Sequence, residues 1–223
     1  MEHRQVARSA SPRGELVLRE RQDHDHEPVL ELRANGLFVM DTAETGSERA
    51  LATAALAASG PARHVLVGGL GLGFTLREVL ADPQVRRCTV VEIEPALVTW
   101  MRDGTIPHGP ALLADERVEV VVADVADHLP ESADAAYDVV LLDVDNGPAN
   151  LVHAQNAALY GAPLLAQLHR VCRRAVVIWS AARSPDLLTA MQAVFSEVEE
   201  IRCPVDLQGR AEDYWLYAAR RRP

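Results

Sequence analysis

The sequence predicts an α/β fold: a mostly parallel, seven-stranded sheet preceded by a small N-terminal β-hairpin region. Short apolar runs rich in β-branched residues alternate with segments of helical spacing, which is typical of a parallel sheet covered by helices on both faces. In addition, a glycine-rich turn joins one of these runs directly to a helical segment. We therefore divide the chain into a disordered tail (1–14), a small β region (15–45) and one main domain (46–223).

The N-terminal region is expected to be small. Residues 1–14 are polar and contain Pro12 and Gly14, so we expect them to be disordered. Three short strands are predicted after them, at residues 16–18, 29–32 and 37–40. Asn35-Gly36 is typical of a hairpin turn, because both positions accept positive φ. His24 and His26 could bind a metal, but alternating His and acid in a polar loop is more often solvated surface, and we expect no metal site.

The main domain is expected to begin with an alanine-rich helix over residues 47–59, which Gly60-Pro61 ends. Seven strands are predicted after it, at residues 64–67, 88–93, 118–122, 137–142, 175–179, 198–202 and 213–219. Further helices are predicted at residues 74–81, 95–102, 157–171 and 186–195, the third of them interrupted near Gly161 and Pro163; residues 104–110 are expected to form a loop.

The glycine-rich turn after the first of these strands indicates a nucleoside site. It contains Gly68, Gly69, Gly71 and Gly73, and Glu92 ends the next strand. Glycines let the backbone approach a ligand, and an acid at that place can accept hydrogen bonds from two ribose hydroxyls. Such turns serve both dinucleotides and S-adenosylmethionine, and four glycines could also form a plain tight connection.

Three acids are predicted at the carboxyl ends of neighbouring strands, where α/β sheets bind ligands. Glu92 is the candidate for the ribose, and Asp124, followed by Val125, is the candidate for the adenine amine. Asp143 and Asp145 are the catalytic candidates: a carboxylate there could hold a cationic amine and remove its proton before attack on a sulfonium carbon. The alternative for Asp145 is a plain turn with the Asn-Gly-Pro that follows it.

Composition narrows the class of protein. A net charge of −10 argues against polyanionic partners such as nucleic acid or membrane surfaces and favours a small neutral or cationic substrate. The sequence contains no apolar run of membrane-spanning length and no signal-peptide core. Three widely spaced cysteines indicate reduced thiols, and we expect a cytoplasmic protein.

Several segments in order resemble the spermidine synthase (polyamine aminopropyltransferase) family. They are VLVGGLGLGFTLREVL, VVEIEP, VVVADVADHL, YDVVLLDVDNGPANL and NAALY, within residues 64–180. The resemblance implies a Rossmann-like class I methyltransferase fold and a donor that is S-adenosylmethionine or its decarboxylated form. It also implies that Glu92 binds ribose, that Asp124 binds adenine and that Asp143 deprotonates the attacking amine. The family's N-terminal β region packs into dimers, which implies a homodimer.

The sequence departs from the family at positions that bear on chemistry. The family's turn is usually GGGDGG, whose Asp engages the donor's aminopropyl amine, and Leu72 stands at that place. The family's Gln and Asp-Glu-x-x-Tyr-His segment is replaced by MDTAETGSERALATAAL. Its DSSDP becomes DVDNG, from Asp143 to Gly147. The acceptor pocket is expected to be built by loops such as residues 42–50 and 144–163.

Three functions stay open. The first is an alkyl transferase acting on an amine, with Asp143 as base. The second is a small-molecule methyltransferase without polyamine activity, which the leucine at position 72 favours. The third is a non-catalytic protein that binds adenosyl nucleosides, for which Asp143 would be unnecessary. A nicotinamide-dependent oxidoreductase is disfavoured, because no second substrate domain is evident.

Overall fold

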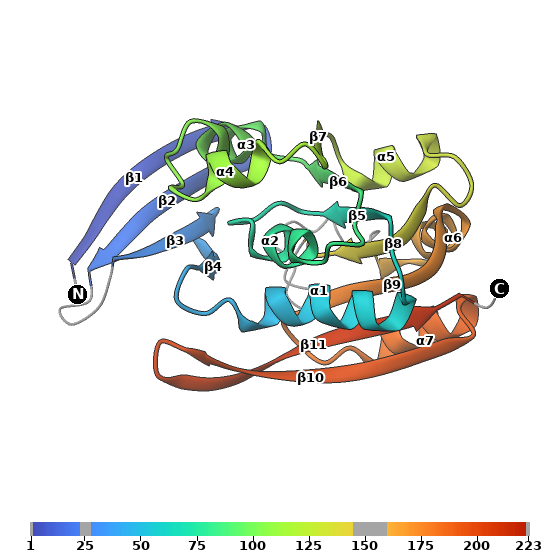
Figure 1. Ribbon diagram of the computed structural model, residues 1–223. Helices are drawn as coiled ribbons and strands as arrows, with labels where there is room; N and C mark the ends of the chain where they lie inside the picture. The colour runs from blue at the N-terminus through green and yellow to red at the C-terminus, as the bar shows by residue number, and fades with distance from the viewer. Residues whose placement is uncertain (1, 23–27, 145–159, 222–223) are drawn as a thin grey trace.

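Two sheets organise the part of the chain that the computed structural model describes, residues 2–22, 28–144 and 160–221 (Figure 1). A four-stranded sheet forms the N-terminal region, and a seven-stranded sheet with helices on both faces forms the rest. No helix among these residues is long and apolar enough to cross a membrane.

The N-terminal sheet is antiparallel, with its strands in chain order. They are β1 (Glu2–Ser11), β2 (Gly14–Gln22), β3 (Val29–Ala34) and β4 (Leu37–Asp41). The predicted hairpin at Asn35-Gly36 is confirmed: both residues have positive φ, 53° and 79°, and they join β3 to β4.

The expected disorder of residues 1–14 is wrong for the described residues of that segment. β1 pairs with β2 from the partners Glu2 and Gln22 to Ser11 and Gly14. The ladder satisfies the backbone groups of β1 that face β2, and the polar side chains of β1 form cross-strand pairs such as Arg4 with Glu20 (3.0 Å). A polar, solvent-facing edge strand has the composition of a disordered segment, which is why composition misled the prediction.

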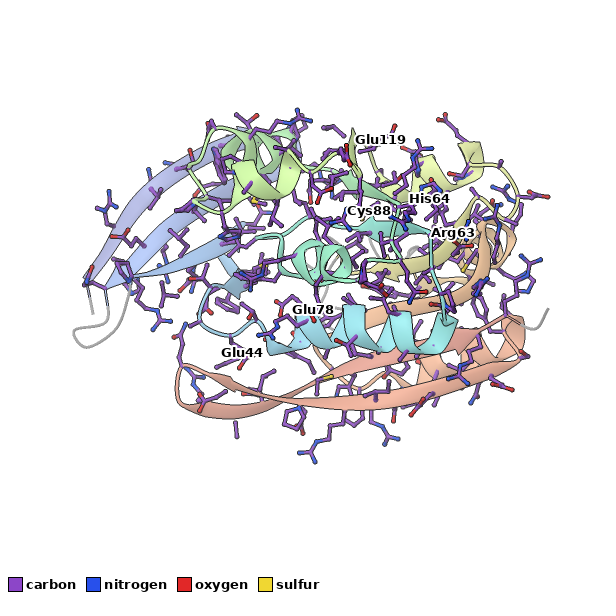
Figure 2. All side chains as sticks on the ribbon, viewed as in Figure 1. Glu44, Arg63, His64, Glu78, Cys88 and Glu119 are labelled. Carbon is purple, nitrogen blue, oxygen red and sulfur yellow. The ribbon has the colours of Figure 1, made fainter. Side chains whose placement is uncertain are left out.

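The main sheet has the strand order β10-β11-β9-β8-β5-β6-β7, and all seven predicted strands are confirmed. They are β5 (His64–Gly68), β6 (Arg87–Glu92), β7 (Val118–Val122), β8 (Tyr137–Leu142), β9 (Cys172–Ser180), β10 (Glu197–Leu207) and β11 (Arg210–Arg220). Strands β5 to β9 pair in parallel, and β10 and β11 add an antiparallel edge. At the start of β5, the ring of His64 lies 3.1 Å from the hydroxyl of Thr89 on β6 (Figure 2).

Helices cover both faces of this sheet because its central strands β5, β6, β8 and β9 are apolar on both sides. Val65 and Val67 face the core that lies under the three helices at residues 46–59, 74–81 and 95–102. Leu66 faces the opposite core, under the helices at residues 125–131, 162–171 and 185–194. The helices are α1 (Gly46–Ser59), α2 (Phe74–Ala81), α3 (Pro95–Arg102), α4 (Gly109–Leu113), α5 (Val125–Glu131), α6 (Ala162–Val171) and α7 (Pro185–Val194).

Two helix predictions need adjustment. The segment expected to be a loop at residues 104–110 ends in α4, whose first residue, Gly109, fits tightly under Met101: an added Cβ would lie 2.2 Å from the Met101 carbonyl oxygen. The helix expected at 157–171 is described from Ala162, after the predicted break, and residues 157–159 lie outside the described ranges.

Candidate functional site

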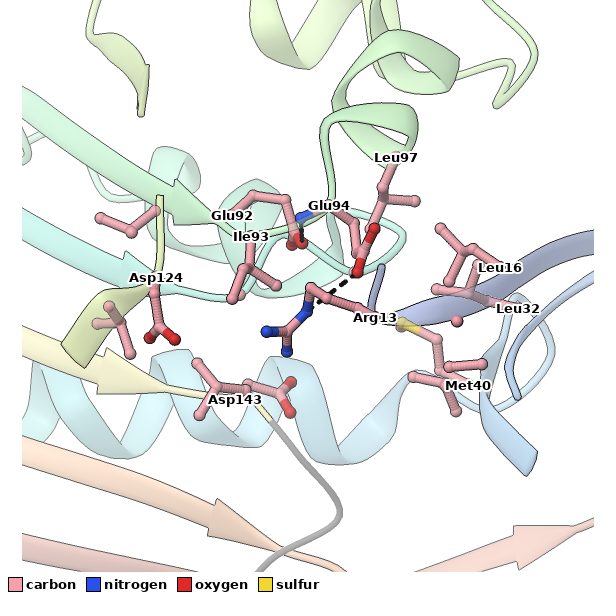
Figure 3. Close-up of a pocket in the computed structure, with 18 of the residues that line it drawn as sticks. Arg13, Leu16, Leu32, Met40, Glu92, Ile93, Glu94, Leu97, Asp124 and Asp143 are labelled. Atoms are coloured by element: carbon pink, nitrogen blue, oxygen red, sulfur yellow. Dashed lines mark hydrogen bonds and ion pairs between the residues drawn. The ribbon is translucent and has the colours of Figure 1, made fainter. Parts of the chain in front are cut away.

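A pocket lies where the carboxyl ends of the parallel strands meet the N-terminal sheet (Figure 3). The main domain contributes most of the acids of its lining, and β2, β3 and β4 contribute apolar residues such as Leu16, Leu32 and Met40. The predicted site residues that line it are Gly69, Gly71, Glu92, Asp124, Val125 and Asp143. The structure therefore brings together acids from the ends of three strands, as the sequence predicts.

Two glycines of the turn allow the backbone to form the floor of the pocket. Gly69 has a φ of 89°, and a Cβ there would lie 2.0 Å from the carbonyl oxygen of Asp143. Gly71 has a φ of 50°, and its Cβ would lie 2.7 Å from the Met40 sulfur. A side chain at Gly69 would be strained and would collide with the Asp143 backbone, and one at Gly71 would be strained and would collide with Met40.

The other two glycines do not line this pocket. A Cβ at Gly68 would meet the side chain of Leu142, 2.6 Å away, and one at Gly73 would meet Met101 Cε at 2.7 Å. Their places in the structure are explained by packing between β5, β8 and α3.

Leu72 points away from the pocket. Its side chain is fully buried in the core under α1 and α2. Its backbone amide donates to the Met40 sulfur (3.2 Å), and its carbonyl oxygen accepts from His108 Nε2 (2.6 Å). The position where the family's turn carries an acid is therefore a core position in this chain.

Glu92 is held rigidly at the end of β6. It is 6% exposed, and its carboxylate accepts hydrogen bonds from the backbone amides of Leu70 (2.7 Å) and Glu94 (2.8 Å). Burial raises the pKa of this carboxyl, and the hydrogen bonds from the backbone oppose that shift. Each carboxylate oxygen can accept more than one hydrogen bond, so capacity for ligand hydroxyls remains.

Asp124 caps the helix that follows β7. Its side chain accepts from the backbone amide of Ala126 (2.9 Å), which fixes the carboxylate at the first turn of α5. Val125 is buried beside it and lines the pocket.

Asp143 follows β8 and is half-buried, and its backbone amide donates to the carbonyl oxygen of Gly68 (2.8 Å). Burial raises the pKa of its carboxyl to about 8, and repulsion from Glu48 and Glu92 adds to the shift. The second catalytic candidate, Asp145, lies outside the described residues.

Sequence reasoning did not single out Glu48 and Arg13, which also line the pocket. Glu48 lies in the first turn of α1, within the segment expected to build the acceptor pocket. Arg13 comes from the turn between β1 and β2, and Figure 3 shows its guanidinium among Glu92, Glu94 and Asp143. Its Nε lies 3.2 Å from Glu94 Oε1. No local motif marks either residue, because their places depend on how the N-terminal sheet and α1 pack on the main sheet.

Comparison with known proteins gives consistent matches. A family model described as the spermine/spermidine synthase domain matches residues 44–202. Polyamine aminopropyltransferase 2 of Pseudomonas aeruginosa is 33% identical over 156 residues, which are 64% of this chain and 42% of that protein. A polyamine aminopropyltransferase of Shouchella clausii is 39% identical over 89 residues, 39% of this chain and 32% of that protein. The chain thus spans less than half the length of these curated relatives.

Solved structures match the fold over almost the whole chain. A spermidine synthase in complex with the transition-state analogue AdoDATO has a TM-score of 0.81 at 16% identity, covering 98% of this chain and 74% of that one. The spermidine synthase of Thermotoga maritima has a TM-score of 0.79 at 16% identity, covering 98% and 73%. At this identity the likeness shows a shared Rossmann-like fold.

The buried position of Leu72 makes a prediction about stability. Leu72→Asp would place a carboxylate in the apolar core, and we expect the variant to lose several kcal/mol of folding free energy, on the order of the cost of an unpaired buried polar or charged group. Urea unfolding measures this loss. Leu37→Asp is the matched control, because Leu37 is 50% exposed. Equal stability of the two variants would contradict the core position of Leu72.

The raised pKa of Asp143 makes a prediction about pH. In the unfolded chain this carboxyl has a pKa near 3.8, and in the folded protein about 8. The stability that its proton contributes is therefore fully present below about pH 4 and is lost as the pH rises through about 8. We expect urea unfolding of the ligand-free protein to show this loss, with a slope of at most about 1.4 kcal/mol per pH unit. Asp143→Asn should show a shallower slope, and an identical slope would refute the shift.

Proposed function

The chain belongs to the spermine/spermidine synthase family, and from this premise we propose that it transfers an alkyl group, aminopropyl or methyl, from an S-adenosyl sulfonium donor to a small-molecule amine. The observation that supports this most is the meeting of Glu92, Asp124 and Asp143 around one pocket. The first two are fixed by backbone hydrogen bonds, whereas the third has no ion-pair partner among the described residues.

The pocket lining fits an adenosyl group. Gly69 and Gly71 line the pocket without a side chain, and their lack of a Cβ lets the turn pack closely against Asp143 and Met40. Glu92 would accept hydrogen bonds from the ribose hydroxyls, and Asp124 at the start of α5, beside Val125, would accept one from the adenine amine. When bound, the donor supplies a sulfonium carbon that is open to nucleophilic attack.

Asp143 is the group that we propose as general base. It would accept a proton from the acceptor's ammonium group, which frees the nitrogen lone pair for attack. The new N–C bond forms as the C–S bond breaks, and the electron pair of that bond leaves on sulfur as a neutral thioether. A pKa of about 8 suits this role, because a base is most effective near the working pH.

Charge supports an amine as the acceptor. The charged residues that line the pocket are Glu15, Glu48, Glu92, Glu94, Asp124 and Asp143, with Arg13 as the cation among the described lining residues. Such a lining attracts cations and repels anionic substrates.

Two observations favour methyl transfer from S-adenosylmethionine as a second candidate. Leu72 supplies no acid for the ammonium group of the decarboxylated donor. Furthermore, the guanidinium of Arg13 could pair with the carboxylate that S-adenosylmethionine has and its decarboxylated form lacks.

The donor assignment makes a prediction for binding. Wild-type protein should bind S-adenosylmethionine or its decarboxylated form in calorimetric titrations and should bind NAD far more weakly. Glu92→Ala should abolish the binding of the preferred donor, because the ribose loses its acceptor. Undiminished binding by the variant would remove the adenosyl assignment, and preference for NAD would exclude the transferase class.

The base assignment makes a prediction for turnover. Asp143→Asn keeps the shape of the side chain, so its affinity for methylthioadenosine, an adenosyl thioether without an ammonium group, should stay within a few-fold of wild type. Its turnover should fall by about 100-fold or more, the usual contribution of a general base. The wild-type pH profile of kcat/KM should rise with pH through an apparent pKa near 8. Full turnover by the variant would mean that Asp143 is not the base.

A further inference from the structure

Glu48 is a buried carboxylate on a rigid part of the pocket wall. It is 7% exposed, lies in the first turn of α1 and lines the pocket together with Asp143. The loop before α1 is fixed by Asp41, whose Oδ1 accepts from the amides of Ala43 and Glu44, both at 2.9 Å. The hydroxyl of Thr75, next to the glycine-rich turn, lies 3.4 Å from the Glu48 carbonyl oxygen. Glu48 is thus held in place by the same elements that form the turn.

The buried acids of the described residues that lie outside this pocket have a cationic partner. Glu31 pairs with Arg19 (2.7 Å) and Arg33, and Asp41 pairs with Arg21 (3.2 Å). This is the usual requirement for a buried charge.

Glu48 and Asp143 lack such a partner. No Arg or His among the described residues forms an ion pair with either acid, and the nearby cation, Arg13, pairs with Glu94. Among the described residues, the Glu48 carboxylate accepts hydrogen bonds from the neighbouring hydroxyl of Ser47 (2.9 Å) and from its own backbone. Glu92 and Asp124 of the same pocket also lack a cation, but they accept hydrogen bonds from the backbone amides of other residues. Within the described chain, Glu48 and Asp143 have neither form of compensation from another residue's backbone or from a cation.

We propose that Glu48 and Asp143 together bind an ammonium group of a ligand, and that Glu48 supplies the carboxylate that Leu72 does not. The inference rests on the proposed function, because it assigns a ligand group to the same pocket. The group that the two acids would recognise is an alkylammonium, which can belong to the donor or to the acceptor.

The donor set fits an ammonium group. An ammonium has three N–H donors and is satisfied by two carboxylates and one further acceptor, whereas a metal ion needs a larger set of ligands. The described residues contain no group of three His, Cys, Asp or Glu side chains placed to hold a metal. Leu72 lies in the core, so the acid has to come from another element, and α1 packs directly on α2 beside the turn.

Electrostatics agree with a site that is completed by a cation. Burial raises the pKa of Glu48 to about 7, and nearby Glu44 and Asp41 add to the shift. Burial likewise raises the pKa of Asp143 to about 8, with Glu48 and Glu92 as the acids that repel it. A bound ammonium would reverse both shifts, so binding near neutral pH should release protons.

The test compares ligands that differ by the ammonium group. Calorimetry would measure the affinity of wild type and Glu48→Gln for methylthioadenosine, which has no ammonium, and for the preferred sulfonium donor, which has one. A second arm would titrate a diamine such as putrescine into protein saturated with methylthioadenosine. Glu78→Gln is the matched control, because Glu78 lies on α2 (Figure 2), pairs with Arg49 and is not a lining residue.

We expect Glu48→Gln to bind methylthioadenosine as wild type does. It should lose about tenfold or more in affinity for the ammonium ligand, in the donor arm or in the acceptor arm, which identifies the source of the ammonium. It should also release fewer protons on binding. Wild-type affinities for Glu48→Gln in both arms would overturn the inference while leaving the proposed function intact. If wild type bound none of the adenosyl compounds, the proposed function would fall and the inference with it.

Discussion

Parallel pairing of β5 with both of its neighbours is the constraint on which the site depends. Gly68 lies opposite Val91 of β6 and opposite Leu142 of β8, so Gly69, Glu92 and Asp143 follow at the same level on three strands. Backbone hydrogen bonds keep this alignment just beyond the strand ends. The amide of Gly69 donates to the Val91 carbonyl oxygen, and the amide of Asp143 donates to the Gly68 carbonyl oxygen, both at 2.8 Å. A shift of one residue would turn the acids to another face of the sheet.

The acids that line the pocket fall into two groups, which differ in how the protein stabilises their negative charge. The carboxylates of Glu92 and Asp124 accept hydrogen bonds from backbone amides, and these hydrogen bonds can remain in place when a neutral sugar or base binds. No cation of the described chain pairs with Glu48 or Asp143, and burial raises the pKa of both carboxyls. We propose that the ammonium group of a ligand supplies the positive charge that the protein does not. Where that ammonium belongs to the acceptor, proton transfer from it to Asp143 begins the reaction.

Sequence patterns predicted the centre of the main sheet well because β5, β6, β8 and β9 are buried on both faces and therefore form nearly continuous apolar runs in the sequence. The positions of the acids that follow those runs could be predicted too, because the carboxyl ends of parallel strands lie at the same edge of the sheet. β1 was missed because polar edge strands carry no apolar pattern. Glu48 and Arg13 were missed because only tertiary packing brings them to the pocket, and Asp145 lies where the structure gives no description.

The most direct test of the account is to identify the nucleoside product by mass spectrometry. Protein, an amine and each sulfonium donor would be incubated together, with Asp143→Asn as the parallel sample. We predict a thioether product that forms only when an amine is present and that is lost in the variant. Methylthioadenosine would identify aminopropyl transfer, and S-adenosylhomocysteine would identify methyl transfer. A protein that binds the donor but yields neither thioether with any amine would contradict the proposed transferase.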